Sequence, residues 1–291
     1  MQIAFLALMF ILGATLGSFL CCQARRLRAR EVHHHKLPRR SVCLHCHKPL
    51  KWHDNLPLIS WFLLKGRCRY CHHKIGILEI ASEVALALTF LALSAHFLLT
   101  APAYPTSLLA SFPQINPLNW GIFLLTLLLS LSLGFLAIYD GAYGELPSPC
   151  LTFSIICAII IVILQQQASF SVVASLATAP ALFPDNPWST LISAVLSAAL
   201  FSGLYLALYL ASHGKWVGDG DWLYALAIGL VLGHPWLALL AIFIANLSAT
   251  LIMFPILKLH PTRSRQIHFA PFLFFAFVIT LTFSNFFISM I

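Results

Sequence analysis

Charged side chains are scarce in this sequence. Of its 291 residues, 9% are Asp, Glu, Lys or Arg, whereas 60% are hydrophobic. A soluble protein carries about 25% charged residues, which help to cover its surface. The shortage of charge therefore excludes the soluble globular classes and indicates a membrane protein.

Charge is also absent from the first apolar run, Met1–Leu20, and a group of arginines begins only after it, at Arg25. A cleaved signal peptide carries its positive charge before the apolar core. We therefore expect the first run to be retained as a membrane helix with its N-terminus outside.

Apolar runs suited to membrane helices recur along the chain. A spanning helix needs about 17–25 apolar residues, and its backbone groups must bond internally because lipid offers no partners. The sequence therefore predicts an all-α, polytopic membrane bundle of about eight transmembrane helices, of which the fourth and sixth are short. The predicted spans are Met1–Cys22, Ile80–Thr100, Trp120–Tyr139, Cys150–Leu164, Leu191–Ala211, Trp222–Gly233, Trp236–Leu257 and Phe269–Ile291.

Basic residues are concentrated in one segment. Thirteen of the 17 Lys and Arg lie in residues 25–77, and the others are Lys215, Lys258, Arg263 and Arg265. With eight helices, all of them fall on one side, which the positive-inside rule identifies as the cytoplasm. Such a segment is an orientation signal or a site for anionic lipid, not a nucleic-acid interface. We divide the chain into a first helix (1–24), a cytoplasmic loop (25–77) and a membrane bundle (78–291).

Two CxxC pairs lie in the basic loop, Cys43 with Cys46 and Cys68 with Cys71. Two such pairs supply the four thiolates of a tetrahedral zinc site. A cytoplasmic loop is kept reduced, which disfavours disulfides. The spacing therefore predicts a structural zinc site, and we interpret the nearby run His33–His35 as part of a solvated linker.

Each cysteine pair is followed by a histidine, His47 or His72, so both also match CxxCH, the attachment pattern for c-type haem. Such haems are attached outside the cytoplasmic membrane, whereas the charge pattern places this loop inside. Zinc is the favoured interpretation, and the absorption spectrum of the purified protein distinguishes the two.

Acidic residues number only nine, and two of them lie at the predicted membrane boundary on the cytoplasmic side. Asp140 ends the third predicted helix, and Asp221 begins the sixth in the run Gly218-Asp219-Gly220-Asp221. A charge at this depth is costly and indicates function. The alternative is that Asp219 or Asp221 serves only as the N-cap of the sixth helix.

The sequence lacks a HExxH motif and a phosphate-binding loop, and it shows no Ser-His-Asp set. Two neighbouring carboxylates catalyse peptide hydrolysis without such groups, because like charges close together retain one proton between them. The ionised member activates water and the protonated member polarises the scissile carbonyl. We therefore predict Asp140 and Asp221 as a catalytic pair.

In their order along the chain, these motifs resemble those of the bifunctional prepilin peptidases, also called type IV leader peptidases, which are GxGD-class intramembrane aspartic proteases. The resemblance covers most of the chain, and the cysteine loop together with the GxGD run is its most specific part. The matching residues are Leu16–Leu20 with Arg26, the segment from Cys43 to Cys71, Glu83, Asp140–Pro147, Gly218–Asp221 and Phe269–Phe272.

This resemblance implies an inner-membrane endopeptidase with Asp140 and Asp221 as the catalytic aspartates, facing the cytoplasm. The implied substrates are type IV prepilins or pseudopilins of pili or type II secretion systems, cut after the glycine of a short basic leader. The family also N-methylates the new terminus with S-adenosylmethionine. From their negative charge, we add Glu79, Glu83 and Asp219 as candidate contacts for the basic leader.

The chain departs from the family pattern in three places. Ser148 replaces the last aspartate of the first catalytic motif, Cys21 follows Leu20 where the family has asparagine, and Leu78-Glu79-Ile80 replaces arginine-tyrosine-proline. The last two changes leave open a peptidase without methyltransferase activity. A non-enzymatic membrane metal-binding or transport protein is the alternative from another class.

Overall fold

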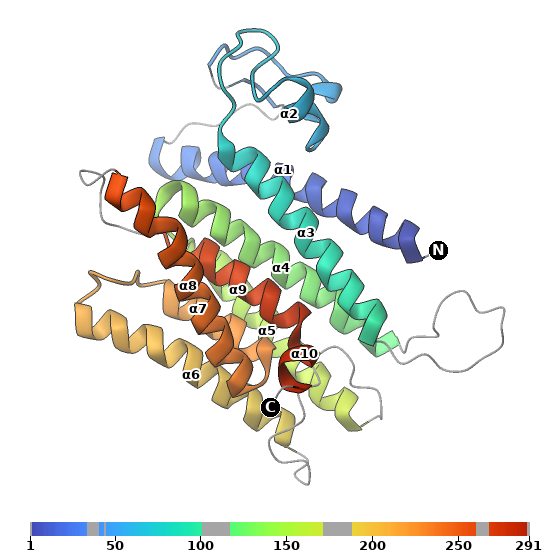
Figure 1. Ribbon diagram of the computed structural model, residues 1–291, viewed down its shortest axis with the longest axis vertical. Helices are drawn as coiled ribbons and strands as arrows, with labels where there is room; N and C mark the ends of the chain where they lie inside the picture. The colour runs from blue at the N-terminus through green and yellow to red at the C-terminus, as the bar shows by residue number, and fades with distance from the viewer. Residues whose placement is uncertain are drawn as a thin grey trace, which may run out of the picture. The chain divides into compact units, whose positions relative to one another are not determined.

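The computed structural model describes residues 2–33, 41–43, 45–100, 117–170, 188–259 and 268–289 (Figure 1). This part of the chain forms two compact units, Gln2–Leu91 and Ala92–Ile291. Its secondary structure is helical apart from two isolated β-bridges in the cysteine loop. The predicted all-α class is confirmed. Of the residues considered above, His34, His35, Arg263 and Arg265 lie outside the described residues.

The N-terminal unit contains α1 (Gln2–His33), η1 (Trp52–Asn55), α2 (Ile59–Leu63) and the first turns of α3 (Ile77–Thr100). Helix α1 continues past the apolar run into the arginine-rich stretch, because Arg, Ala and Leu there all favour helix. It is therefore longer than the predicted span Met1–Cys22, and the first part of the predicted loop is helical.

Helices α1 and α3 cross in close contact at two glycines. A Cβ on Gly13 would lie 2.4 Å from the carbonyl oxygen of Leu86, and one on Gly17 would lie 2.5 Å from that of Ser82. The two glycines are four residues apart and share one helix face, which is the small-xxx-small pattern of membrane helix pairs. The spacing of these glycines is visible in the sequence and was a missed signal for a close helix contact.

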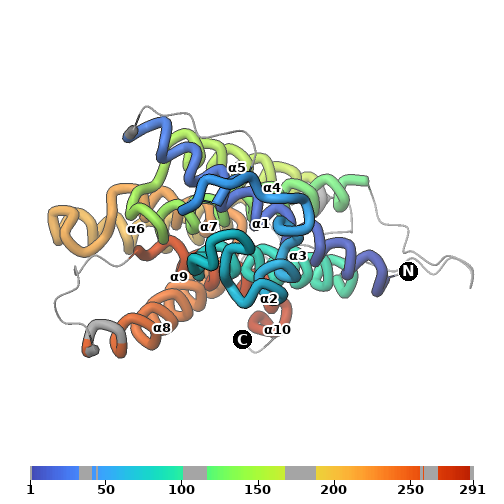
Figure 2. The backbone as a smooth tube through the Cα atoms, turned by 90° about the horizontal axis from the view of Figure 1, so that it is seen from above, coloured from blue at the N-terminus to red at the C-terminus, as the bar shows by residue number. Residues whose placement is uncertain are grey.

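The C-terminal unit is a helical bundle. Its helices α4 and α5 lie side by side, α7 packs against α5 and α6, and α9 packs against α4 and α8 (Figures 1 and 2). The helices that follow α3 are α4 (Pro117–Tyr143), α5 (Ser148–Phe170), α6 (Ser189–Ser212), α7 (Asp221–Leu232), α8 (Pro235–Leu259), α9 (Ala270–Thr282) and α10 (Ser284–Ser289).

Six of the described helices, α1, α3, α4, α5, α6 and α8, are long and apolar enough to cross a membrane, which identifies a multi-pass membrane protein. The prediction of a short fourth span was wrong, because α5 has 23 residues and continues through three polar glutamines. The short sixth span was predicted correctly as α7, with 12 residues. The predicted last span is interrupted at Phe283, so that α9 has only 13 residues.

Helix α7 is buried along most of its length, and its packing explains its sequence. A Cβ on Gly229 would lie 2.7 Å from the Cα of Ala198 in α6, so only glycine permits this approach. On another side, the hydroxyl of the fully buried Tyr224 donates to the carbonyl oxygen of Leu133 in α4 at 2.9 Å. The helix ends at Gly233, which adopts the left-handed conformation and allows the tight turn before α8.

Candidate functional site

Asp140 lies in the last turns of α4 and is 7% exposed. Its Oδ2 accepts a hydrogen bond of 3.1 Å from the backbone N–H of Ala270, the first residue of α9. Its Oδ1 lies 3.8 Å from Nδ1 of His268, just before that helix. The carboxylate therefore sits at the N-terminus of α9, where free N–H groups and the helix dipole favour negative charge.

Asp221 occupies the equivalent place on α7, as its first residue, and is 6% exposed. Its Oδ2 accepts a hydrogen bond of 3.0 Å from the backbone N–H of Gly218. Each of the two short apolar helices thus has an aspartate carboxylate at its N-terminus. This arrangement offsets part of the cost of burying two acids, because both receive a backbone donor and a favourable dipole.

The structure brings these two aspartates together although they are far apart in the sequence. They are close enough for the charge of Asp140 to act on Asp221. Tyr224, one turn into α7, lies within electrostatic range of both carboxylates. Both carboxylates are thus buried and influence each other electrostatically, and their role as a catalytic pair stays a prediction.

Gly220 explains how the two motifs meet. A Cβ at this position would lie 2.8 Å from Cδ1 of Leu146, in the turn after α4, and 3.3 Å from Cδ1 of Leu151 in α5. The backbone of the GxGD run therefore lies directly on the turn that follows Asp140. Gly144 in this turn has a φ of +72°, which glycine adopts without strain.

Asp219 does not cap α7. The N-cap residue is Gly220, no side-chain cap bond is formed, and Asp219 is exposed. Interpreting Asp219 as the N-cap was therefore wrong. Its charge does act on Asp221, so it contributes to the electrostatics of the pair from the surface.

His268 and the N–H of Ala270 are neighbours of Asp140 that sequence reasoning missed. They lie on either side of Phe269, at the start of the family-like motif Phe269-Ala270-Pro271-Phe272. A proline in the first turn marks the start of a helix, and a helix N-terminus is a natural partner for a carboxylate. That signal was present, but it does not say which carboxylate lies there.

The four cysteines of the loop converge on one point. Their sulfur atoms all lie within 4.8 Å of one another, and the Sγ atoms of Cys43 and Cys71 are 3.8 Å apart. Zn–S bonds of about 2.3 Å in a tetrahedron place the sulfurs about 3.8 Å apart. Cys43, Cys46, Cys68 and Cys71 therefore fit a single metal ion, and such convergence disfavours two separate haem attachments.

The two CxxC pairs form turns with the same backbone pattern. The N–H of Cys43 donates to the carbonyl of Lys48 and that of Cys68 to the carbonyl of His73, at 3.0 and 2.9 Å. The histidines that complete the apparent CxxCH patterns, His47 and His72, both have a φ of +55°. These histidines therefore occupy the left-handed position of a metal-binding turn, which accounts for them without haem.

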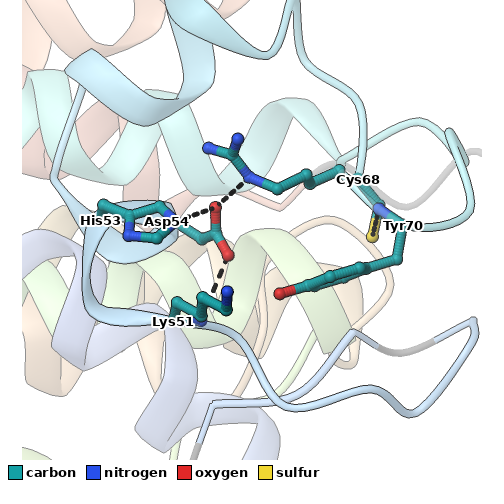
Figure 3. Close-up of polar contacts among 6 residues, drawn as sticks. Lys51, His53, Asp54, Cys68 and Tyr70 are labelled. Carbon is teal, nitrogen blue, oxygen red and sulfur yellow. Dashed lines mark hydrogen bonds and ion pairs between the residues drawn. The ribbon is translucent and has the colours of Figure 1, made fainter.

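Asp54 ties η1 to the second cysteine turn (Figure 3). Its Oδ1 accepts a hydrogen bond of 2.7 Å from Nε of Arg69 and its Oδ2 one of 3.1 Å from the N–H of Lys51. Burial opposes the charge, but these hydrogen bonds and the charges of Arg69 and His53 hold the pKa of Asp54 below its usual 3.8. Asp54 is therefore a structural residue of the loop and not a merely solvated acid.

Glu83 also holds the loop in place. It is 8% exposed, and its Oε2 accepts a hydrogen bond of 2.7 Å from the N–H of Leu58. Leu58 has a φ of +61°, a strained value for a residue with a branched side chain, at the start of α2. Glu83 thus joins α3 to a strained turn of the loop. Four residues earlier, Glu79 pairs through Oε1 with Arg25 of α1.

Comparison with known proteins identifies the N-terminal part of the chain. Residues 11–97 match the model of the bacterial peptidase A24 N-terminal domain. This region contains the cysteine loop and the crossing of α1 and α3. No solved structure matches the chain.

Curated relatives match as well. The type 4 prepilin-like proteins leader peptide-processing enzyme of Escherichia coli O78:H11 is 48% identical over 18% of this chain and 19% of its own length. Prepilin leader peptidase/N-methyltransferases of Myxococcus xanthus and Vibrio cholerae are 33% and 34% identical over 37% and 29% of this chain. These two matches span 31% and 36% of the relatives' length. The resemblance to prepilin peptidases is thereby confirmed for the part of the chain that these matches cover.

Proposed function

We propose that this relative of the prepilin leader peptidases is a membrane aspartic endopeptidase that removes the short basic leader of type IV prepilins or pseudopilins. The observation that carries the proposal is the buried pair of Asp140 and Asp221, each at the N-terminus of a short apolar helix. The names of its relatives support the substrate class.

The proposed chemistry follows from the environment of the pair. Two like charges held close in a buried site share one proton, so one carboxyl group is ionised and the other protonated. The backbone donors of Ala270 and Gly218 each engage one carboxylate oxygen, which orients the second oxygen of each group for water or substrate. The ionised member accepts a proton from the attacking water, and the protonated member donates a hydrogen bond to the scissile carbonyl.

We further propose that the enzyme N-methylates the terminus that cleavage exposes, as the names of its relatives indicate for those proteins. S-adenosylmethionine supplies a methyl group on a sulfonium sulfur. The amine nitrogen takes this group as the carbon–sulfur bond breaks and a proton leaves the nitrogen, and S-adenosylhomocysteine remains. If the mature pilin terminus is cleaved but carries no methyl group in mass spectra, the enzyme is the monofunctional alternative.

Zinc is the proposed occupant of the four-cysteine site, where it holds the two turns of the loop together. We also propose an inner-membrane location with the N-terminus outside and the loop and aspartates on the cytoplasmic side, from the distribution of Lys and Arg. In this orientation the exposed Asp219 is a candidate contact for the basic leader, and the loop is a candidate contact for anionic lipid.

The test is cleavage of a prepilin in membranes that contain Asp140→Asn or Asp221→Asn. Each change removes an ionisable member of the pair at nearly constant shape, and we expect a loss of about 10²–10⁴-fold in rate. Glu145→Gln, an exposed acid in the turn after α4, is the matched control and keeps its activity. Processing by both aspartate variants at the normal rate refutes the pair as the catalytic group.

A further inference from the structure

The N-terminal unit contains a cavity that the aspartate chemistry does not use. Its volume is about 470 Å³, and its walls come from α1, the cysteine loop and the first turns of α3. Cavities of about 300–1,000 Å³ suit small molecules. Both polar and apolar side chains line it, among them Arg25, Arg26, Trp61, Glu79 and Ile80.

Two residues that line this cavity each carry a buried polar atom with no hydrogen-bond partner among the described residues. These atoms are the indole Nε1 of Trp61, a donor, and Oε2 of Glu79, an acceptor. This Glu79 oxygen lies close to the backbone of Gly76, where an added Cβ would come within 2.6 Å of it. The great majority of buried polar groups in proteins are paired, so each of these two atoms is available to a ligand bound in the cavity.

The charges on the same wall are of both signs. Glu79 pairs through its other oxygen with Arg25, and Arg26 lines the cavity one residue further along α1. A carboxylate next to guanidinium groups is complementary to a zwitterion, whose ammonium and carboxylate lie a few atoms apart. The free α-amino acid group is the common zwitterion of this size.

Glu83 lines the cavity too, but its Oε2 already accepts the N–H of Leu58. Its role is to hold the strained turn that forms part of the cavity wall. Glu79 therefore offers the unengaged buried acceptor, although the family pattern has tyrosine at this position.

We propose that this cavity binds S-adenosylmethionine, with the α-ammonium group on Glu79 and the α-carboxylate on the guanidinium groups of Arg25 and Arg26. Trp61 donates from Nε1 to an acceptor on the ligand. The inference rests on the methyltransferase half of the proposed function and deepens it. It does not depend on the Asp140–Asp221 pair, neither member of which lines this cavity.

The experiment is calorimetric titration of the purified full-length protein with three probes. S-adenosylmethionine and S-adenosylhomocysteine both carry the amino acid group, whereas 5′-methylthioadenosine shares the adenosine but lacks that group. Leader cleavage and zinc content are measured on the same samples, because cleavage reports on the aspartates and zinc reports on the fold of the loop.

For Glu79→Gln we expect binding of the two amino acid-bearing probes to weaken by about tenfold or more, with binding of 5′-methylthioadenosine changed by less than about twofold. Glu31→Gln, an exposed acid on α1 outside the cavity, leaves all three affinities unchanged. Trp61→Phe weakens all three probes, whereas Trp52→Phe, a tryptophan of the same loop that is 78% exposed, has no effect.

The inference is overturned if the wild-type protein binds none of the probes, or if Glu79→Gln binds S-adenosylmethionine normally. It is also overturned if Glu79→Gln weakens 5′-methylthioadenosine equally while zinc is retained, because the effect is then not on the amino acid group. A protein that binds the donor but cleaves no prepilin contradicts the proposed peptidase function instead. A protein that cleaves prepilin without binding the donor contradicts only this inference.

Discussion

The cysteine loop and the aspartate pair are both polar sites of a mostly apolar protein, but they are built in different ways. The loop brings its four cysteines together through two local turns and a network of short-range hydrogen bonds around Asp54. The aspartate pair joins α4 to α7, with α9 supplying a donor, so its geometry depends on helix packing across the bundle. We therefore expect the cysteine loop to lose its structure when its metal is removed, and the aspartate site to lose its geometry when a larger side chain is placed in a helix contact.

Removal of the metal is expected to have the largest effect and to affect the loop alone. Structural zinc contributes about 10–16 kcal/mol of apparent binding free energy in small zinc domains, because the site does not persist without it. Cys68→Ser is therefore expected to abolish zinc binding and to expose residues 45–75 to hydrogen exchange, with α4 and α7 unchanged. Mass spectrometry of exchange and zinc analysis measure both.

Cys157→Ala is the control for this change, since Cys157 is a buried free cysteine of α5 that is not a member of the four-cysteine cluster. It retains zinc and normal exchange in the loop. If Cys68→Ser retained a full equivalent of zinc, the four-cysteine site would be wrong.

A second change, which overfills the contact between the two aspartate-containing motifs, is expected to affect the aspartate site and not the cysteine loop. Gly220→Ala places a methyl group 2.8 Å from Leu146, and overpacking of this kind costs about 1–3 kcal/mol. Because the strain falls beside Asp221, we expect prepilin cleavage to fall by about 10–100-fold, while zinc content stays normal.

Gly203→Ala is matched to this substitution, because a Cβ there meets nothing within 4 Å. It is expected to cleave at the wild-type rate. Equal activity of the two variants would show that the close approach at Gly220 does not position Asp221.

The third comparison concerns Asp54, where we expect a loss of stability in the loop and no loss of catalysis. Replacing it with Asn removes a charged acceptor of two hydrogen bonds, and we expect the loop to lose about 1.5–3 kcal/mol of stability. Since the pKa of Asp54 is lowered by folding, this stabilisation is present above its usual pKa of 3.8 and is lost as the pH falls through the lower folded value. Hydrogen exchange of the loop at pH 7 compares Asp54→Asn with wild type.

Asp219→Asn, an exposed acid of the C-terminal unit, is the control and leaves exchange in the loop unchanged. If the loop of Asp54→Asn is protected from hydrogen exchange as well as that of wild type, the hydrogen bonds of Asp54 do not stabilise the loop beyond what the metal provides.

Structure was predicted correctly from the sequence where a single short segment determines it. The two CxxC pairs imply their own turns, and the apolar runs imply helices because lipid leaves the backbone no other partner. The prediction was less accurate at helix ends: α1 and α5 both continue into polar residues that favour helix. The structural partners of Asp54 and Glu83 could not be predicted for a related reason, since Arg69 and Leu58 are specified by the fold of the loop and not by any motif.

The membrane class, the helical architecture and the cysteine site were thus readable from composition and spacing, because these properties depend on hydrophobicity and on ligands close in the chain. Tertiary structure alone decided that Asp140 meets the N-terminus of α9, that Gly220 lies on Leu146, and that Trp61 and Glu79 share a cavity wall. Each of these contacts joins segments that are not adjacent in the sequence. Such contacts depend on how the shapes of the packed helices and turns fit together, and a sequence pattern does not show this fit.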